Sequence, residues 1–279
     1  MKPVKKIAVI HDICGVGKAA MTNIVPILSI MGFEVCQVPT MLLSTHTGGY
    51  GKPYVQKIDG YMTGCLTHYI EQNVTFDMIF VGYLGTEERI KEVKQFLINY
   101  REVNPEVTII LDPIFGDNGS CYSNFTMEYV SQMRMVLSYA DIILPNFTEY
   151  CLLLEEDMNV IYNNKDAATY PWHKKLERFT VKNAIITSIP LSNNEEIGIA
   201  IVDEDNIDIL SFQKCSKSYH GTGDIFAGVF CGAVLQGDSI LQACKRAHSF
   251  VVECLEESMK YDYDKREGVI LEPLLRKLL

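Results

Sequence analysis

The stretch His220-Gly221-Thr222-Gly223-Asp224-Ile225-Phe226-Ala227-Gly228 carries the most specific pattern in this chain. Apolar residues recur at helical spacing from Phe226 onward, which places Asp224 in the first turn of a helix. The glycines let backbone N–H groups converge without interference from a Cβ atom. The first helical turn has unpaired N–H donors and the positive end of the helix dipole, which together bind anions such as phosphate. An acid there repels an anion, so Asp224 is explained as a general base that takes a proton from an attacking hydroxyl. An ordinary capped helix after a glycine turn is the alternative.

The composition fits an enzyme of moderate size. Of the 279 residues, 48% are hydrophobic, which is enough for a sizeable core. The net charge of −10 argues against nucleic acid or an anionic membrane surface as a partner, although a nucleotide needs only a local electropositive pocket. The nine cysteines form no C-x-x-C pair, so we expect reduced thiols and a cytoplasmic protein. No secretion signal is visible, and the longest apolar run, Ile225–Leu235, is shorter than the roughly 20 residues that span a bilayer.

Short apolar runs alternate with helical patterns along the chain. This alternation predicts a mostly parallel sheet with helices on both faces, in one domain over residues 1–279. Ile197–Val202 and Ile207–Phe212, around the acidic turn 203–206, predict an antiparallel hairpin near one edge, and the stretches 163–165 and 192–196 are expected to be loops. Ser239 and Gln242 form a capping-box pattern that opens a last long helix. The predicted strands are Ile7–Ile10, Phe33–Val38, Met78–Val81, Val107–Leu111, Ile142–Leu144 and Ala184–Thr187.

Polar residues follow the predicted strands. In open parallel sheets, ligands collect at the carboxyl ends of the strands, so these residues are candidates for one site. They are His11-Asp12, Thr45-His46-Thr47, Tyr83, Asp112, Asn146 with Glu149, and Thr187-Ser188.

Two nucleotide-binding motifs fail on inspection. Gly15-Val16-Gly17-Lys18 suggests a P-loop, but that pattern requires glycine at Asp12 and Ser or Thr at Ala19. The loose dinucleotide fingerprint also fits Gly15, Gly17 and Ala20, but the turn begins too far after Ile10 and the second predicted strand lacks the expected acid at its end.

The acids near the remaining strands suggest magnesium and phosphoryl transfer. Asp112-Pro113-Ile114-Phe115-Gly116-Asp117 forms a defined turn that presents two acids, and Glu149 follows another strand. Paired acids near a phosphate site usually hold Mg²⁺. Turn formation and helix N-capping are the alternative for Asp112 and Glu149. With the Gly221–Asp224 loop, the parts fit amides that stabilise a moving phosphoryl group and an aspartate that activates the acceptor.

The chain resembles ribokinase-like small-molecule kinases, and within them pyridoxal (pyridoxine, pyridoxamine) kinases. Five segments carry the resemblance, over nearly the whole length. They are Leu43-Ser44-Thr45-His46-Thr47-Gly48, which is similar to a Ser-Asn-His-Thr segment, Val81-Gly82-Tyr83, the run from Asp112-Pro113 through Gly116-Asp117 to Gly119-Ser120-Cys121-Tyr122, Pro145-Asn146-x-x-Glu149, and Gly221-Thr222-Gly223-Asp224.

The resemblance implies a ribokinase-like three-layer α/β/α fold with an antiparallel edge hairpin, ATP as co-substrate, Mg²⁺ or another divalent cation, a monovalent cation such as K⁺, and a homodimer. It also implies a role for each matching residue. Gly221, Thr222 and Gly223 form the anion hole and Asp224 is the base. The pyridine contacts are His46, Thr47, Asp12, Tyr83 and Tyr122; the nucleotide contacts are Asp112, Asn146, Glu149, Thr187, Ser188 and Thr222; the metal ligands are Asp112, Asp117 and Glu149.

Two departures bear on the substrate. Members of the family commonly have Ser-His after the first strand, with the serine on the pyridine ring, where this chain has His11-Asp12; Asp12 is the candidate replacement. Thr45 replaces the usual asparagine. A hydroxymethylpyrimidine kinase of the same superfamily is therefore a second hypothesis, although its Ser-Gly-Gly-Ala-Gly-like first loop differs from Asp12–Gly17. A non-catalytic ligand-binding protein on this fold is the third, and the intact acids count against it.

Overall fold

The computed structural model describes residues 4–159, 170, 172, 176–203, 206–217 and 219–279. The chain divides into two compact units. The first contains the chain up to Gly85, Val103–Val107 and Cys215–Leu279, and the second contains Thr86–Glu102 and Thr108–Lys214. That the chain forms a single domain stays a prediction.

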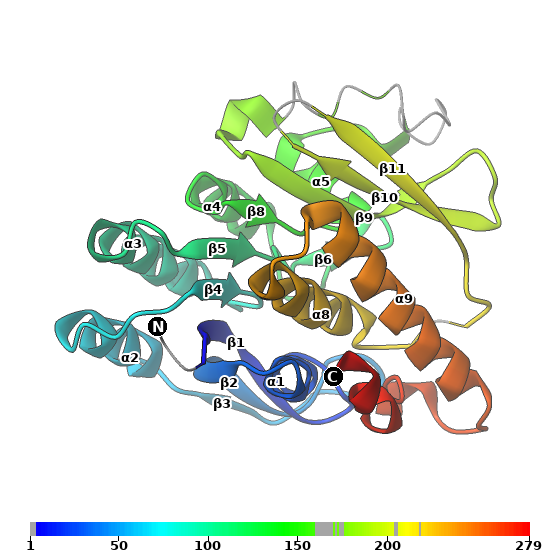
Figure 1. Ribbon diagram of the computed structural model, residues 1–279, viewed down its shortest axis with the longest axis horizontal. Coiled ribbons are helices and arrows are strands. Elements are labelled where there is room, and N and C mark those ends of the chain that lie inside the picture. Colours follow the sequence, from blue (N-terminus) through cyan, green and yellow to red (C-terminus); the bar gives the residue numbers. More distant parts are fainter. Residues whose placement is uncertain (1–3, 160–169, 171, 173–175, 204–205, 218) are drawn as a thin grey trace. The chain divides into compact units, whose positions relative to one another are not determined.

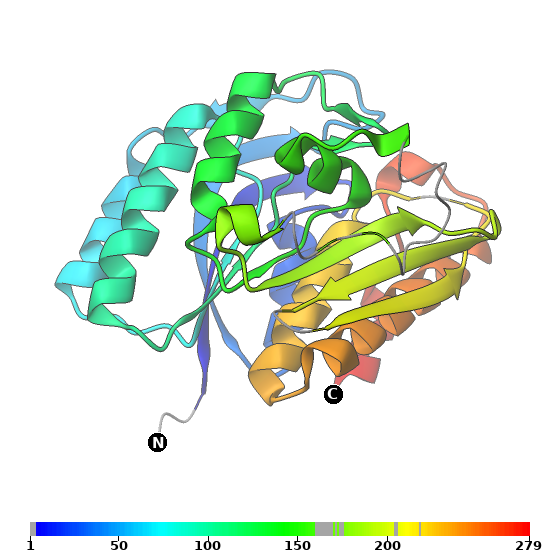
Figure 2. The ribbon, with the colours of Figure 1, turned by 90° about the horizontal axis from the view of Figure 1, so that it is seen from above.

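The strands of the first unit lie in the order β4 (Met78–Val81), β1 (Lys6–Val16), β2 (Glu34–Thr45) and β3 (Val55–Lys57). Strand β1 pairs parallel with both β4 and β2, and β3 pairs antiparallel with β2. The helices are α1 (Met21–Ile30), α2 (Tyr61–Glu71), α8 (Thr222–Gln236) and α9 (Ile240–Met259), followed by the short 3-10 helices η2 (Lys265–Glu267) and η3 (Glu272–Leu278). Helix α8 packs between α1 and α9 (Figure 1). Seen from above, α2 lies on the opposite side of these strands from α1, α8 and α9 (Figure 2).

The strands of the second unit lie in the order β5 (Thr108–Leu111), β8 (Ile142–Ile143), β9 (Asn183–Pro190), β10 (Glu196–Val202) and β11 (Ile207–Gln213). The first three are parallel, and β9, β10 and β11 are antiparallel. A small hairpin of β6 (Gly116–Asp117) and β7 (Ser120–Cys121) follows β5. The helices are α3 (Glu87–Val103), α4 (Met127–Leu137) and α5 (Phe147–Leu154), with the 3-10 turn η1 (Glu177–Phe179).

Most of the predicted elements are confirmed. The mostly parallel sheet, the helices on both faces and the β10–β11 hairpin at the edge are present. Ser239 and Gln242 form the predicted capping box of α9. The predicted loop at 192–196 is present up to Glu196, where β10 begins. The predicted loop at 163–165 and the acidic residues 204 and 205 of the hairpin turn lie outside the described residues.

The predicted ends of the first two strands were wrong. Strand β1 continues through His11 and Asp12 to Val16, and β2 continues to Thr45. Beyond an irregularity between His11 and Ile13, the two strands pair again, from Ile13 with Leu42 to Val16 with Thr45. Backbone pairing alone extends the ladder where the apolar pattern stops, so the side chains of His11 and Asp12 lie on a strand and not on the loop after it.

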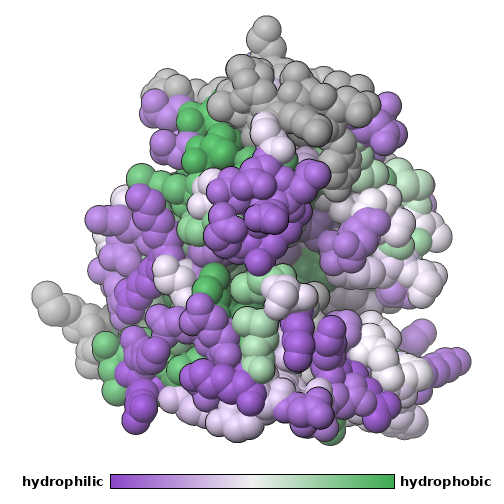
Figure 3. All heavy atoms as spheres, turned by 90° about the vertical axis from the view of Figure 1, so that its right-hand side faces the viewer, coloured by the Kyte–Doolittle hydropathy of each residue, from purple (hydrophilic) through white to green (hydrophobic). Residues whose placement is uncertain are grey.

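Among the described residues, no helix is both long and apolar enough to cross a membrane. On the face drawn in Figure 3, hydrophilic side chains predominate and hydrophobic ones form small groups.

Candidate active site

The anion-binding loop begins α8 as the sequence predicts. Gly221 is the N-cap residue, Thr222 is the first helical residue, and Asp224 lies in the first turn. Gly221 has a φ of 87°, and a Cβ atom there would lie 2.0 Å from the carbonyl oxygen of Lys18. Only glycine fits this position without strain. No side chain among the described residues caps this N-terminus, so its N–H groups keep the anion-binding character that a helix start provides.

The carboxylate of Asp224 has two neighbours in the first unit. Its Oδ2 accepts a hydrogen bond of 2.7 Å from the backbone N–H of Ala20. Its Oδ1 lies 3.4 Å from Nε2 of His11, a contact that is long for a hydrogen bond. The side chain of Asp224 is 14% exposed, so these contacts hold it in place while it stays reachable from solvent.

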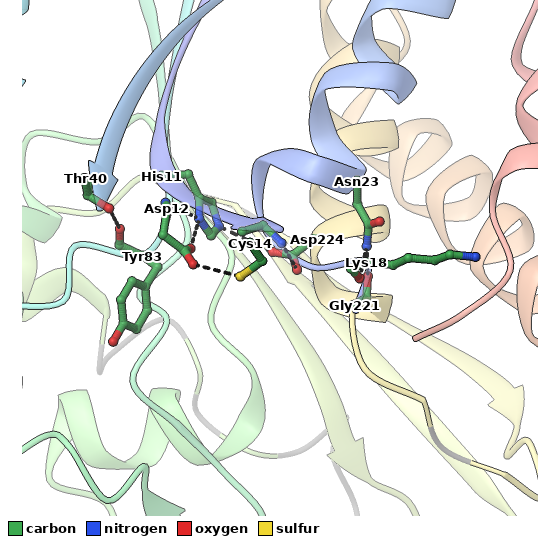
Figure 4. A network of polar contacts seen from close by, with 10 residues as sticks. His11, Asp12, Cys14, Lys18, Asn23, Thr40, Tyr83, Gly221 and Asp224 are labelled. Atoms are coloured by element: carbon green, nitrogen blue, oxygen red, sulfur yellow. Dashed lines mark hydrogen bonds and ion pairs between the residues drawn. The ribbon is translucent and has the colours of Figure 1, made fainter. Parts of the chain in front are cut away.

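His11, Asp12 and Cys14 complete a buried network next to Asp224 (Figure 4). Nδ1 of His11 lies 2.7 Å from Oδ1 of Asp12, and the thiol of Cys14 donates to Oδ2 of Asp12 at 3.2 Å. Burial by itself would lower the pKa of His11, but its contacts with Asp12 and Asp224 outweigh burial and raise the pKa to about 10. Burial, reinforced by the charge of Asp12, raises the pKa of the Cys14 thiol, which therefore stays protonated as a donor.

The loop between β1 and α1 packs against the anion-binding loop. Asn23, on α1, donates from Nδ2 to the carbonyl oxygens of Lys18 at 2.6 Å and of Gly221 at 3.2 Å. Lys18 and Ala20 both have positive φ, at 53° and 59°. This backbone conformation is costly for residues with a Cβ atom, and the Asn23 contacts help to hold it. The loop is thus neither a P-loop nor a dinucleotide turn; it shapes the surroundings of Asp224.

His46 is buried, and both of its ring nitrogens have partners within the protein. Nδ1 accepts from the backbone N–H of Gly48 at 3.0 Å, and Nε2 lies 2.6 Å from the carbonyl oxygen of Arg266, to which it donates. The rings of His220 and Tyr50 lie 4.5 and 5.3 Å from the His46 ring, centroid to centroid. His46 therefore holds the segment after β2, and its contact with a pyridine ring stays a prediction.

The other predicted substrate residues lie in different surroundings. Thr47 is exposed, whereas Asp12 is buried with both oxygens bonded. Tyr83 accepts a hydrogen bond from Thr40 at its carbonyl and packs against a cluster formed by Cys14, Ala20, Met41 and Leu43. Tyr122, in the second unit, is 42% exposed.

In the second unit, Asn146 and Glu149 form a capping box at the start of α5. Oε1 of Glu149 accepts from the N–H groups of Phe115 and Gly116 at 3.1 and 3.3 Å, and Oε2 accepts from that of Asn146 at 2.9 Å. The capping role that the sequence offered as an alternative for Glu149 is therefore present. Burial and the charge of Asp112 raise the pKa of Glu149 well above its usual value, against the effect of these three hydrogen bonds.

Apart from Thr222, which lies in the first unit, the residues expected near the nucleotide and the metal are spread over three segments of this unit. Asp112 is half-buried after β5, while Asp117 is exposed and accepts from Asn118 within the β6–β7 turn. Thr187 and Ser188 lie where β9 loses its regular register with β10, and Ser188 has a φ of 61°. Irregular strand positions of this kind often border active sites.

The donor set fits a magnesium ion of the type that binds with substrate. Among the described residues, no group of three or more His, Cys, Asp and Glu side chains could hold a metal. Mg²⁺ in phosphoryl-transfer sites needs only one or two carboxylates besides phosphate and water. Asp112 and Glu149 are close enough for the charge of one to raise the pKa of the other, a repulsion that a divalent cation would relieve.

The sequence did not reveal two residues of this site. His11 was noticed only as a polar residue near a strand, and its contact with Asp224 depends on residues far apart in the chain. Asn23 reads as an ordinary position of α1. A histidine inside a buried apolar strand was the available signal for the first; no pattern marks the second.

Comparisons with known proteins agree with the fold and with the family resemblance. The sequence model of the phosphomethylpyrimidine kinase family matches residues 30–268. Two crystal forms of a Bacteroides thetaiotaomicron protein named "putative phosphomethylpyrimidine kinase" superpose with TM-scores of 0.89 and 0.87, at 34% identity over 99% of this chain and 94% and 96% of that one. The second form is described as containing pyridoxal. Pyridoxal kinase from Lactobacillus plantarum superposes with a TM-score of 0.85 at 27% identity, over 99% of this chain and 96% of that one.

Curated relatives point the same way. Pyridoxal kinase from Dictyostelium discoideum is 26% identical over 248 residues, which cover 83% of this chain and 79% of that protein. The match to a Schizosaccharomyces pombe relative with a pyridoxal kinase name spans 72% of this chain but only 59% of that protein. The ribokinase-like fold and the resemblance to pyridoxal kinases are thereby confirmed.

Proposed function

This chain belongs to the phosphomethylpyrimidine kinase family, and we propose that it catalyses the ATP-dependent phosphorylation of a hydroxymethyl group on pyridoxal, pyridoxine or pyridoxamine. The proposal depends mainly on the start of α8, where a helix N-terminus without a side-chain cap lies next to the partly exposed carboxylate of Asp224. The relative that was crystallised with pyridoxal, at 34% identity, supports a pyridine as the acceptor.

The geometry suits a direct transfer. The hydroxyl oxygen of the vitamer attacks the γ-phosphorus of ATP, the bond from that phosphorus to the bridging oxygen breaks, and ADP leaves. The hydroxyl proton passes to the carboxylate of Asp224. The N–H groups of Gly221, Thr222 and Gly223 stabilise the charge on the moving phosphoryl group. A divalent cation, when bound, offsets the charge of the phosphate oxygens.

The metal is assigned to the second unit, and so are the nucleotide contacts other than Thr222. We assign Asp112 and Glu149 to the divalent cation, directly or through water, because their mutual repulsion favours a cation there. Asp117, which accepts hydrogen bonds only within its own turn, is the weaker candidate ligand. Asn146, Thr187, Ser188 and Thr222 are the proposed nucleotide contacts.

The vitamer is assigned to residues of the first unit, and Tyr122 of the second unit remains a contact that only the resemblance implies. We propose Thr47 and Tyr83 as its direct contacts. His46 and Asp12 act there mainly by holding the backbone and the buried network, because their polar atoms already have partners. The further assignments to a homodimer, a cytoplasmic location and a dependence on K⁺ are part of the same proposal; nine cysteines without a disulfide support the second of these.

A hydroxymethylpyrimidine is the second candidate substrate, because the family and the relative at 34% identity both carry a phosphomethylpyrimidine kinase name. The test is product analysis with ATP and Mg²⁺ over a panel of the three pyridine vitamers and hydroxymethylpyrimidine. We expect phosphorylated pyridine products at the higher kcat/KM. Phosphorylation of the pyrimidine alone would transfer the assignment to the second candidate, and ATP-independent ligand binding without any product would favour a binding protein.

A further inference from the structure

His11 is a buried histidine that the proposed chemistry leaves without a role. It lies on β1, its side chain is 2% exposed, and two carboxylates face its two ring nitrogens. Nδ1 lies 2.7 Å from Asp12, and Nε2 lies 3.4 Å from Asp224 with no hydrogen-bond partner at ordinary distance. The ring connects a fully engaged acid with the acid that we assign to catalysis.

The geometry places a proton on Nδ1 of His11. The backbone N–H of Asp12 lies 2.9 Å from Nδ1, which would suit an unprotonated nitrogen. However, Oδ1 of Asp12 lies closer, at 2.7 Å, and two lone pairs at that distance repel each other unless a proton lies between them. Nδ1 therefore carries a proton. Nε2 can then carry the second proton, toward Asp224, and the positive ring lies between two negative groups.

The surroundings keep the ring in this orientation. Gly82, just after β4, leaves room for it, because a Cβ atom there would lie 2.0 Å from Cδ2 of His11. The Phe80 ring stacks on it at 6.2 Å between centroids. Within the described residues, the titratable groups that face His11 are Asp12 and Asp224, with the Cys14 thiol bound to the far oxygen of Asp12.

We propose that His11 is a positioning residue, which holds the carboxylate of Asp224 in the orientation that accepts the proton of the substrate hydroxyl. The proposal rests on the proposed function, because it presumes that Asp224 is the base. Oδ2 of Asp224 is tied to the N–H of Ala20, and the imidazolium attracts Oδ1. The two contacts fix both oxygens, and the 3.4 Å separation leaves Oδ1 with capacity for the incoming proton.

The charges support a role of this kind and not a proton relay. Before transfer, two carboxylates and one imidazolium carry a net charge of −1; after Asp224 takes the proton, Asp12 and His11 remain as a neutral pair. The proton needs no further acceptor within the network, because His11 already holds both of its own. His11 thus stays charged throughout the reaction. The network returns to its starting state when Asp224 releases its proton to solvent or product.

A pair of histidine replacements separates the two ring nitrogens. The amide of Asn can occupy the place of Nδ1 and donate to Asp12, whereas the longer Gln can place its amide near the position of Nε2 and donate to Asp224. We expect His11→Asn to lower kcat at least tenfold with the KM for ATP within twofold, and to move the acid limb of the kcat–pH profile to higher pH. His11→Gln should recover most of the lost kcat. His68→Asn, at an exposed position on α2, is the matched control and should behave as the wild type.

Several outcomes would overturn the proposal. One is that both His11 variants keep the kcat and the pH profile of the wild type. Another is that both variants lose the same factor in kcat while the pH profile does not shift. A measurement on the wild type tests the proposal even if the His11 variants do not fold. Nitrogen-15 NMR of the imidazole should show a doubly protonated ring at pH 8, with an Nε2 resonance that changes in Asp224→Asn. A neutral ring at that pH would also refute the proposal. Full activity of Asp224→Asn would instead refute the role of Asp224 as the base, whereas a wild-type protein that forms no phosphorylated vitamer would refute the proposed function.

Discussion

Replacement of Asp224 by asparagine tests the proposed mechanism at its centre. The amide is nearly isosteric with the carboxylate, and its oxygen can still accept the N–H of Ala20 that Oδ2 now accepts at 2.7 Å. Its nitrogen would then take the place of Oδ1, 3.4 Å from Nε2 of His11. Two donors would face each other there, so His11 would lose its Nε2 proton more easily. Apart from this contact with His11, the substitution gives the local backbone no reason to change.

The expected loss follows from what the amide cannot do. It cannot accept a proton at neutral pH, and general-base assistance typically contributes about 10²–10⁴-fold, or about 3–5 kcal/mol of transition-state stabilisation. We expect kcat to fall within that range. The KM for ATP should stay equal or fall, because a negative charge beside the phosphate site is removed. The unfolding free energy should change by no more than about 1.5–3 kcal/mol, the size of one charged hydrogen bond.

The assay measures phosphorylated vitamer directly, at saturating ATP and Mg²⁺, with ADP release in the absence of vitamer as the control for uncoupled hydrolysis. ATP binding and the melting temperature are measured on the same preparation. A variant with near-normal kcat and a lowered melting temperature would mean that Asp224 only stabilises the start of α8. The mechanism would then be wrong, whatever the substrate.

Three further predictions concern neighbouring features. Gly221→Ala should lose activity and at least about 1–2 kcal/mol of stability, because alanine is strained at a φ of 87° and its Cβ would meet Lys18. The control Gly64→Ala, in open space inside α2, should stabilise the protein by about 0.5–1 kcal/mol, and equal melting temperatures of the two variants would contradict this prediction. His46→Ala removes two hydrogen bonds of about 1 kcal/mol each and should raise the KM for the vitamer on the order of tenfold and that for ATP little, while equal increases would mean a general structural role. Because the pKa of His11 is raised from 6.5 to about 10, the stability that protonated His11 contributes to the folded protein is complete below about pH 6.5 and is lost toward pH 10. The melting temperature of the wild type should therefore fall over that range more steeply than that of His11→Gln.

Local patterns predicted the elements that depend on nearby residues. The start of α8 at Thr222 and the capping box of Ser239 with Gln242 each involve positions within one helical turn. The β10–β11 hairpin follows from two apolar strands around an acidic turn. In each case the stabilising contact lies within a few residues of the signal, so the sequence alone was sufficient.

Contacts between distant segments were not predictable in this way. The N–H of Ala20 reaches Asp224 across 204 positions, and nothing near either residue marks the other as its partner. The length of β1 also escaped prediction, because His11 and Asp12 interrupt the apolar pattern while the backbone ladder with β2 continues. Glu149 is a third case: one motif predicted both metal binding and helix capping, and the structure confirms the capping.

His11 and Asp12 are best understood as one coupled pair. Asp12 binds the imidazole with one oxygen and the Cys14 thiol with the other, and its side chain is 7% exposed. A neutral side chain at position 12 would leave a buried imidazolium with only Asp224 as a charged partner, and a buried charge without close compensation is costly. Asp12 is therefore needed wherever His11 is charged, which explains the pair independently of the vitamer. For Asp12 to contact the pyridine ring as well, it would have to release the Cys14 thiol, and we therefore propose Thr47 and Tyr83 as the more direct determinants of which vitamer is bound.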